Sequence, residues 1–501
     1  MGDSIEARTF TRQDRTQFRA KTERCLDALA SMLADGRFAT VDAPDSQLGM
    51  EIELNLVDEH GAPARSNEAV LEAIASPAFQ TELARFNVEI NVAPRPIGRG
   101  HLRELEDVLR GALDVADQRA RSTGSGLAMI GMLPTLDETH FTERWFSADP
   151  RYSLLGQQIL AARGEDIELQ IDGVALGDDH PADQLAMVCD TILPEAACTS
   201  VQLHLQVAPD SFASYWNAAQ AIAGPQVALA ANSPFFAGKA LWHETRIPMF
   251  EQATDIRPQE LKNQGVRPRV WFGERWITSI FDLFEENSTY FSALLPVCSD
   301  EDPFEALDEG RAPELSELRM HNGTVYRWNR PIYDAGDGTA HLRLENRVLP
   351  GGPTVVDVMA DAAFYYGLVR STAEADRPIW TQMTFDAAAE NLREAARGGL
   401  ESRLYWPEVG WISPRELVLR RLLPAAAEGL DAFGVDPDVR DRYLGIIEQR
   451  CLTGRNGAVW QRENVAARER SGASRTDALH GMLADYIERM QSGEPVHTWT
   501  H

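Results

Sequence analysis

The stretch LGMEIELNLVD, residues 48–58, decides the fold. Apolar residues occupy every second position and alternate with Glu51, Glu53 and Asn55, which is typical of a β-strand with one buried face. At about 3.3 Å per residue, the side chains of Glu51 and Glu53 point to the same side about 6.6 Å apart. Carboxylates this close repel each other unless water or a cation lies between them. The second face is therefore either a solvated face or a divalent metal site.

Three further stretches repeat this alternation. The polar positions are Asn87, Glu89 and Asn91 in FNVEINV (86–92), Gln202, His204 and Gln206 in VQLHLQV (201–207), and His341, Arg343, Glu345 and Arg347 in HLRLENRVL (341–349). They carry no Lys, Ser or Thr, and they are rich in the residue types that coordinate metals and grip phosphates. On a shared sheet, one face would hold several Mg²⁺ ions and a polyphosphate. Alternation alone fits an antiparallel sheet with one wet face equally well.

Charge and composition exclude several classes of function. The 501 residues include 48 Lys and Arg against 76 Asp and Glu, a net charge of −28, so nucleic acids and anionic membrane surfaces repel the protein. No apolar run reaches the roughly 18 residues of a membrane span. The five cysteines are scattered without a C-x-x-C pair, and the start MGDSIEARTF lacks an apolar signal-peptide core. We expect a cytoplasmic protein, and the sequence leaves its oligomeric state open.

Strands and helices follow one another irregularly, which predicts an α+β fold. No G-x-x-x-x-G-K-[ST] motif is present, so a P-loop is excluded. The expected helices are 11–36, 101–121 and 214–236, the expected strands are 83–94, 126–136, 200–209 and parts of 324–350, and 299–315 is expected to be an exposed acidic loop. From about residue 353 the pattern is helical almost to the end.

The ordered set E-x-E, V-E-I-N, Q-x-H-x-Q and E-x-R resembles the glutamate–cysteine ligase family of the second type, the carboxylate–amine ligases. It occurs in GMEIELN, VEINVAP, SVQLHLQV and HLRLENRVLPGGPTVVDVMADAAFYYGL. The resemblance runs from about residue 45 to about 370. It implies a curved antiparallel sheet of the glutamine synthetase catalytic type, flanked by helices. We expect a catalytic domain at 1–375, preceded by the helix at 11–36, and a helical C-terminal region at 376–501 that packs on it.

The resemblance also implies a site on the concave face of the sheet. It implies that the metal ligands are Glu51, Glu53, Glu89, His204 and Glu345, with two or three Mg²⁺ ions. It also implies that Arg347 contacts the transferred phosphate and that Arg330 is a second catalytic arginine, which contacts either phosphate or the substrate carboxylate. Arg343, Gln202 and Gln206 would contact the nucleotide, and Arg246 in LWHETRIPMFEQ would bind the substrate carboxylate. The simpler alternatives are a hydrogen-bonded His204 and an Arg246 in an ordinary ion pair. Many relatives carry a histidine where this chain has Gln202.

The implied function is ATP-dependent amide-bond formation. ATP phosphorylates a carboxylate, and an amine then displaces phosphate from the acyl phosphate, which requires positioning and positive charge more than a protein nucleophile. Most simply the enzyme joins glutamate to cysteine, and another amine acceptor is nearly as well supported. A small-molecule phosphotransferase and a catalytically silent nucleotide-binding regulator are the alternatives. The segment TGRNGAVWQRENVA (453–466) is expected to be a helical cap on the sheet rather than a lid.

Overall fold

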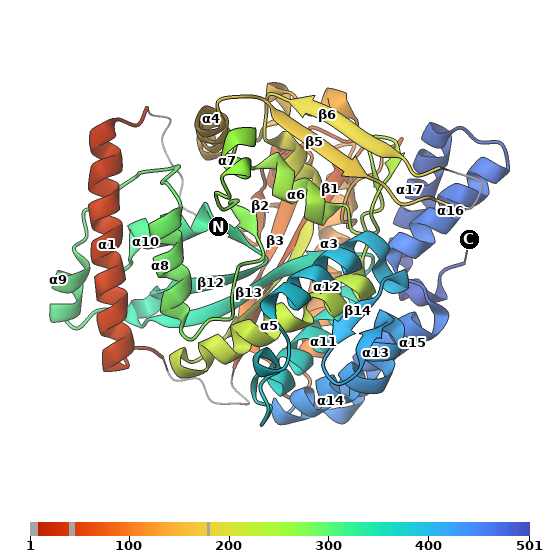
Figure 1. Cartoon of the computed structure of the whole chain (residues 1–501). Coiled ribbons are helices and arrows are strands. Elements are labelled where there is room, and N and C mark those ends of the chain that lie inside the picture. The colour runs from red at the N-terminus through yellow and green to blue at the C-terminus, as the bar shows by residue number, and fades with distance from the viewer. Residues whose placement is uncertain (1–8, 40–45, 178–180, 501) are drawn as a thin grey trace.

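The computed structural model describes residues 9–39, 46–177 and 181–500 of the chain. A seven-stranded antiparallel sheet lies at its centre, with strand order β12-β13-β7-β1-β3-β2, and helices surround it (Figure 1). The short strand β4 pairs with the C-terminal end of β1. The strands of this sheet are β1 (Gln47–Val57), β2 (Phe79–Thr81), β3 (Asn87–Pro96), β4 (Gly126–Ala128), β7 (Ser200–Gln206), β12 (Asn329–Asp334) and β13 (His341–Pro350). The predicted α+β fold is confirmed.

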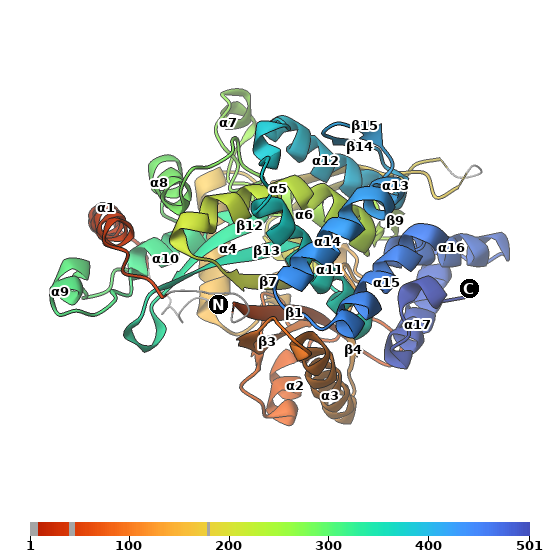
Figure 2. The same ribbon diagram turned by 90° about the horizontal axis from the view of Figure 1, so that it is seen from below.

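Alternation gives the sheet an apolar face that helices cover. Ile52 and Leu344 on this face are fully buried. Helix α5 (Pro209–Ala230) packs on β12 and β13, and α11 (Val355–Ala373) packs on α5 and β7. Helix α3 (His101–Ser122) contacts β3, β4 and α11. In Figure 2, α5, α11 and α14 lie side by side along the sheet. With its apolar face covered in this way, the sheet leaves its polar face to form the site.

A group of helices lies beyond β12, at the left of Figure 1. The helix predicted at 11–36 is confirmed as α1, which begins with a capping box between Thr11 and Asp14 and ends at Gly36 in the left-handed conformation. Its neighbours α8, α9 and α10 contact it directly. The four helices are α1 (Arg12–Asp35), α8 (Ile280–Tyr290), α9 (Pro303–Asp308) and α10 (Ser316–Gly323).

The C-terminal region is helical, as predicted, apart from a short hairpin. Helices α14 and α15 pack on α11, and α12 packs on α5. Because α11 contacts both the sheet and the C-terminal helices, the domain division at residue 375 stays a prediction. The elements are α12 (Phe385–Gly398), β14 (Leu404–Trp406), β15 (Gly410–Ile412), α13 (Pro414–Leu417), α14 (Leu423–Ala432), α15 (Pro437–Thr453), α16 (Gly457–Arg470) and α17 (Arg475–Ser492).

Two predicted segments differ from the structure. The buried run at 126–136 is a strand only at Gly126–Ala128, because Pro134 lacks an N–H for the ladder and Gly131 approaches Pro350 so closely that a Cβ would lie 2.9 Å from it. The acidic segment at 299–315 is not all exposed loop, since it contains α9, whose Leu307 is buried.

The remaining elements connect these layers or lie around the site. Apart from short 3₁₀- and π-helical turns, they are α2 (Asn67–Ile74), α4 (Pro150–Arg163), β5 (Ile167–Asp172), β6 (Gln184–Cys189), η3 (Leu193–Ala197), β8 (Phe235–Phe236), β9 (Lys239–Ala240), α6 (Arg246–Ala253), α7 (Gln259–Asn263), β10 (Val270–Trp271) and β11 (Tyr326–Arg327). Within the described part of the chain, no helix has both the length and the apolar character that crossing a membrane requires.

Candidate active site

The polar positions of the sheet form one row across its strands. Residues opposite each other on antiparallel strands place their side chains on the same face, about 5 Å apart. The row crosses β12, β13, β7, β1 and β3 in that order. Its opposite pairs are Arg330–Glu345, Glu345–His204, Gln202–Glu51 and Glu53–Glu89.

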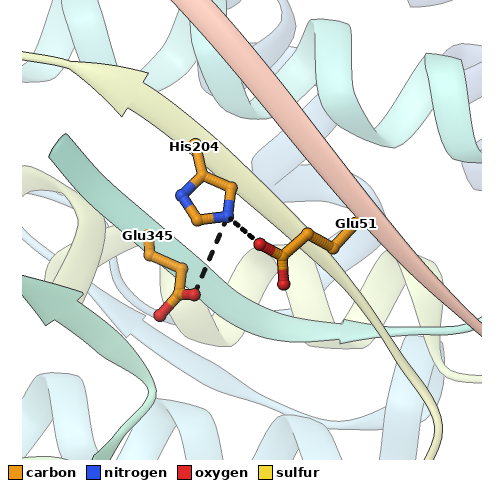
Figure 3. A group of neighbouring side chains, drawn as sticks. All are labelled: Glu51, His204 and Glu345. Carbon is orange, nitrogen blue, oxygen red and sulfur yellow. Dashed lines mark hydrogen bonds and ion pairs between the residues drawn. The ribbon is translucent and has the colours of Figure 1, made fainter. Parts of the chain in front are cut away.

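Glu51, His204 and Glu345 form a first group, the His204 cluster (Figure 3). The Nε2 atom of His204 lies 3.1 Å from Oε1 of Glu51 and 3.7 Å from Oε1 of Glu345. One ligand atom from each residue lies within 4.8 Å of the other two. The side chains of His204 and Glu345 are 9% and 1% exposed, so the cluster is not part of an open wet face.

Two arginines compensate the charge of the His204 cluster. Arg330 donates to Glu345 through Nη2 at 2.9 Å and through Nε at 2.5 Å, and Nη1 of Arg347 donates to Oε1 of Glu345 at 3.3 Å. Burial opposes ionisation of Glu345, but the charges of Arg330, Arg347 and His204 outweigh it and hold the pKa of this carboxyl far below its usual range. Burial likewise opposes ionisation of Glu51, and the hydrogen bond and charge of His204 bring its pKa below the ordinary value.

Glu53, Glu82 and Glu89 form a second group, the Glu89 cluster, in which three carboxylate oxygens lie within 4.8 Å of one another. Its described hydrogen bonds come from neutral donors. The backbone N–H of Ser200 donates to Oε2 of Glu53 at 2.6 Å, and Nδ2 of Asn91 donates to Oε1 of Glu89 at 2.7 Å. None of these donors carries a positive charge. The three carboxyls therefore lie together without a hydrogen bond from a charged side chain of the described residues.

The pKa values of the Glu89 cluster shift in the opposite direction. Burial, followed by the charge of Glu53, raises the pKa of Glu82 to about 7. Burial and the neighbouring carboxylates raise the pKa of Glu89 well above its ordinary value. Burial also raises the pKa of Glu53, although the charge of Arg347 partly offsets it. A positive charge that approaches these carboxyls would favour their ionised forms.

Gln202 bridges the two clusters. Its Nε2 donates to Oε1 of Glu53 at 3.0 Å, and its Oε1 accepts from Nη1 of Arg347 at 2.6 Å. The side chain is buried. Gln202, one of the three residues expected to contact the nucleotide, thus fixes Arg347 relative to the Glu89 cluster.

A cavity of about 290 Å³ lies over the polar row. Opposite the sheet, it is bounded by Arg151 and Tyr152 of α4, by Glu195 of η3, and by residues 316–323 of α10. A separate small cavity of about 20 Å³ shares Glu53, Glu195 and Arg347 with its lining and is also lined by Arg246. The cavity has a size and polarity suited to small charged molecules.

Arg343 lines the β12 end of this cavity, whereas Gln206 does not belong to its described lining. The Nη1 atom of Arg343 bonds with Oδ2 of Asp334 at 3.0 Å and with Nε2 of His341 at 2.8 Å. Gln206 lies opposite Arg343 in the pairing of β7 with β13. Gln206 and Arg343, two of the three residues expected to contact the nucleotide, are therefore neighbours, and of these two only Arg343 lines the cavity.

Arg246 lines this small cavity, where the protein itself already binds its guanidinium. Nε lies 3.1 Å from Oε1 of Glu244, Nη1 donates to the carbonyl of Arg347 at 3.3 Å, and Nη2 donates to the carbonyl of Val348 at 2.5 Å. The residue is 3% exposed. The structure thus places Arg246 next to the site and binds it to protein acceptors.

Sequence reasoning missed Glu82, Glu195 and Arg151. Glu82 directly follows the three-residue strand β2, which is too short for an alternating pattern to be recognised. Glu195 lies in a 3₁₀-helix, and burial raises its pKa to about 8. The side chains of Glu195 and Arg151 form no hydrogen bond or ion pair with the described residues, although both line the cavity. Only their positions in the folded chain reveal them.

Both clusters fit divalent cations. The Glu89 cluster offers carboxylate oxygens, which Mg²⁺ prefers, and a cation there would relieve the repulsion that raises the pKa values of Glu82 and Glu89. In the His204 cluster, the imidazole Nε2 faces both carboxylates, so one point lies within reach of three donors. Arg330 and Arg347 beside them suit the charges of a phosphate chain.

Comparison with known proteins gives one family match and several structural similarities. The sequence model of glutamate–cysteine ligase family 2 matches residues 47–481. The structure is similar to the glutamate–cysteine ligase of Francisella tularensis in complex with AMP, with a TM-score of 0.56 and 12% identity over 91% of this chain and 90% of that chain. For a bifunctional glutathione synthetase from Pasteurella multocida, the TM-score is 0.48 and the identity 13%, over 94% of this chain and 56% of that chain. No curated protein matches the sequence. At these identities, the Francisella structure shows that the fold is shared.

Proposed function

The chain belongs to glutamate–cysteine ligase family 2, and from this premise we propose that it is an ATP-dependent carboxylate–amine ligase, most simply a glutamate–cysteine ligase. The observation that carries this proposal is the presence of two carboxylate clusters beside Arg330 and Arg347 on one enclosed sheet face. Such a site gathers positive and negative groups around a cavity that admits small molecules. Phosphoryl transfer to a carboxylate requires this kind of charge arrangement.

We assign the two clusters to Mg²⁺ and the phosphates of ATP. The His204 cluster and the Glu89 cluster would hold two or three ions, with Glu82 added to the ligands expected from the sequence. Bound Mg²⁺ neutralises phosphate charge during transfer. The protein supplies the oriented carboxylates, and Gln202 keeps the two clusters in register through Glu53 and Arg347.

We assign Arg347 to the transferred phosphate. Its hydrogen bonds with the described residues are made through Nη1, so Nε and Nη2 remain for a bidentate contact with phosphate oxygens. Arg330 is bound to Glu345 through Nε and Nη2, which leaves Nη1. Arg347 would therefore stabilise more of the negative charge that develops on the transferred phosphate than Arg330 does. Arg343 and Gln206 remain proposed nucleotide contacts.

We assign the amino-acid substrate to the α4 side of the cavity. Arg151 and Glu195 offer a guanidinium and a carboxyl without described side-chain partners, and the ammonium group of an α-amino acid would favour the ionised form of the Glu195 carboxyl while Arg151 receives the substrate carboxylate. The nitrogens of Arg246 are already bound, so Arg151 is better placed to receive the carboxylate. The substrate carboxyl that reacts would then extend toward Arg347.

The test is ADP and phosphate release with Mg²⁺-ATP and L-glutamate, with and without a panel of amines headed by L-cysteine. Products are checked by mass. Turnover that depends on an amine, with a product of the matching mass, supports the ligase and names its acceptor. Equal ADP release without any amine points instead to a phosphotransferase. Binding of Mg²⁺-ATP by calorimetry without turnover under any condition points to a regulator.

A matched pair of carboxylate variants ties turnover to the site. Glu345→Gln removes a site carboxylate. Glu416→Gln removes one from an exposed ion pair with Arg420, where the Glu416 side chain is 43% exposed. We expect Glu345→Gln to abolish turnover and Glu416→Gln to leave it unchanged. Equal activity of the two variants would overturn the assignment of the clusters.

A further inference from the structure

Arg347 lies at an irregularity in the pairing of its strand. Asn346 pairs with Leu203, and the ladder resumes with Leu349 opposite Val201. Two residues of β13, Arg347 and Val348, therefore oppose a single residue of β7. This is a β-bulge, which leaves backbone groups out of the ladder and re-aims a side chain.

The guanidinium of Arg246 binds the backbone of this bulge. Nη1 donates to the carbonyl of Arg347 at 3.3 Å, and Nη2 donates to the carbonyl of Val348 at 2.5 Å. Arg246 is the first residue of α6, a separate element that packs on η3 and β10. A buried cation from outside the sheet thus satisfies both carbonyls of the bulge.

Glu244 holds this guanidinium in place. Its Oε1 lies 3.1 Å from Nε of Arg246 and accepts from Oγ of Ser233 at 2.8 Å. Its Oε2 accepts from the backbone N–H of Asn232 at 2.8 Å. Glu244 is fully buried, so the carboxylate depends on these partners for its charge.

Asn232 extends the network to the C-terminal helices. Its Oδ1 accepts from Nε2 of Gln461 on α16 at 2.8 Å, and its Nδ2 donates to Oη of Tyr486 on α17 at 2.8 Å. Gly457 gives Asn232 its space, because a Cβ at this position would lie 2.0 Å from Oδ1 of Asn232. Helices α16 and α17 are therefore bonded to the residue that also bonds Glu244.

We propose that Glu244 and Arg246 are positioning residues that fix the bulge of β13, so that the guanidinium of Arg347 faces the cavity. The network Gln461–Asn232–Glu244–Arg246 then connects the C-terminal helices to the phosphate-binding side of the site. This inference rests on the role of Arg347 in the proposed function. It replaces the expected contact between Arg246 and the substrate carboxylate.

The test compares steady-state kinetics of Glu244→Gln and Arg246→Lys with those of the unmodified chain. Lysine keeps the charge but cannot bond Glu244 and two carbonyls at once. Misplacement of Arg347 should lower kcat about 10²-fold. The KM values for ATP and glutamate should change by less than about threefold, because binding contacts are kept. A raised KM for glutamate with kcat unchanged in Arg246→Lys would overturn the proposal, since it would mean direct substrate contact.

A double-mutant cycle with Arg347→Lys measures the coupling of the two residues in kcat, which a general loss of stability does not produce. If Glu244 acts through Arg347, adding Glu244→Gln to Arg347→Lys should lower kcat by less than about threefold more. Full additivity would overturn the proposal. If Arg347→Lys alone leaves turnover intact, the proposed function fails. If Arg347→Lys is impaired and Glu244→Gln is not, only this inference fails.

The matched control is Asp361→Asn, which disturbs another buried ion pair, away from the site. Oδ1 of Asp361 lies 2.6 Å from Nη1 of Arg450, between α11 and α15. This variant should lower the melting temperature without changing kcat in the folded protein. If Glu244→Gln does not fold, Gln461→Ala tests the far end of the network, and its kcat should fall about three- to tenfold because only the two hydrogen bonds from Gln461 to Asn232 are lost. An unchanged kcat in folded Gln461→Ala would overturn the connection to the C-terminal helices.

Discussion

The two carboxylate clusters lie next to each other on the same sheet face, yet only one of them has its negative charge compensated by bonded arginines. Glu51 and Glu53 are two residues apart on β1, and each belongs to a different cluster. The His204 cluster has Arg330 and Arg347 bonded to Glu345, and the pKa of Glu345 is lowered. The Glu89 cluster receives neutral donors, and the pKa values of its members are raised.

The difference separates a cluster whose cations are built in from one that requires a cation from outside. In the His204 cluster, charge compensation is present in the folded chain and adds to its stability. In the Glu89 cluster, burial and mutual repulsion work against folding when the carboxyls ionise. Equivalent substitutions in the two clusters should therefore change stability in opposite directions while both reduce activity.

Glu345→Gln should have the largest effect. It leaves Arg330 and Arg347 without their carboxylate partner, and breaking a buried ion pair costs about 3–5 kcal/mol of unfolding free energy. Turnover should fall by about 10³-fold or more because phosphate contacts and metal ligands are lost together. Denaturant unfolding and ADP release measure the two effects. Unchanged stability would show that the two arginines do not depend on Glu345.

Arg347→Lys should come next. A lysine keeps a positive charge near Glu345 but cannot bond Gln202, Glu345 and a phosphate in one planar arrangement. We expect kcat to fall about 10²–10³-fold, with a change in unfolding free energy of about 1 kcal/mol. Single-turnover rates of acyl phosphate formation would check the effect. A variant in which only KM rises would place Arg347 in ground-state binding instead.

The strands and their polar faces were predictable from the sequence, because alternation over seven or more residues fixes which side chains share a face. This is why Glu51, Glu89, His204 and Glu345 were identified and found together. Glu82 and Glu195 were not identified, because one follows a three-residue strand and the other lies in a 3₁₀-helix. Nothing periodic marks such positions.

The partners of a charged side chain were also beyond prediction. Arg246 was expected to bind a substrate carboxylate, a role that the charge of an arginine allows. Its observed partners are Glu244 and the carbonyls of Arg347 and Val348. The two carbonyls are out of the ladder because the chain bulges there. A bulge depends on the register between two strands distant in sequence, which single-strand patterns do not contain.

Glu89→Gln should lower activity and raise stability, which sets the two clusters apart most directly. Loss of a metal ligand should weaken Mg²⁺-dependent turnover about 10–100-fold. The metal-free protein should gain about 1 kcal/mol of unfolding free energy because one repelling carboxyl is gone. Thermal unfolding in chelator, beside turnover at several Mg²⁺ concentrations, measures both. If the metal-free variant is less stable than the unmodified chain, the Glu89 cluster is not repulsive.

The last expected difference between the clusters is the pH dependence of stability in the metal-free protein, which leaves activity aside. Glu82 has a pKa of about 7 in the folded chain, above its ordinary 4.5. Between these values the unfolded chain ionises first, so the contribution of Glu82 to stability is present below pH 4.5 and is lost as pH rises through 7. We expect a loss of about 2 kcal/mol between pH 5 and pH 8, reduced for the partial exposure of Glu82 to the cavity.

Two buried histidines change the unfolding free energy in the opposite direction over part of this pH range. The measurement must therefore compare the unmodified chain with a variant at each pH. Burial lowers the pKa of His321 to about 4 and that of His243 to about 3. The contribution of both histidines to the stability of the protein is therefore lost as pH falls below their ordinary pKa of 6.5. Denaturant unfolding in chelator should therefore be compared between the unmodified chain and Glu82→Gln at each pH. The advantage of the variant should grow from pH 5 to pH 8 and disappear when Mg²⁺ is added. An advantage that is constant with pH would mean that Glu82 ionises normally and that the two clusters do not differ in this respect.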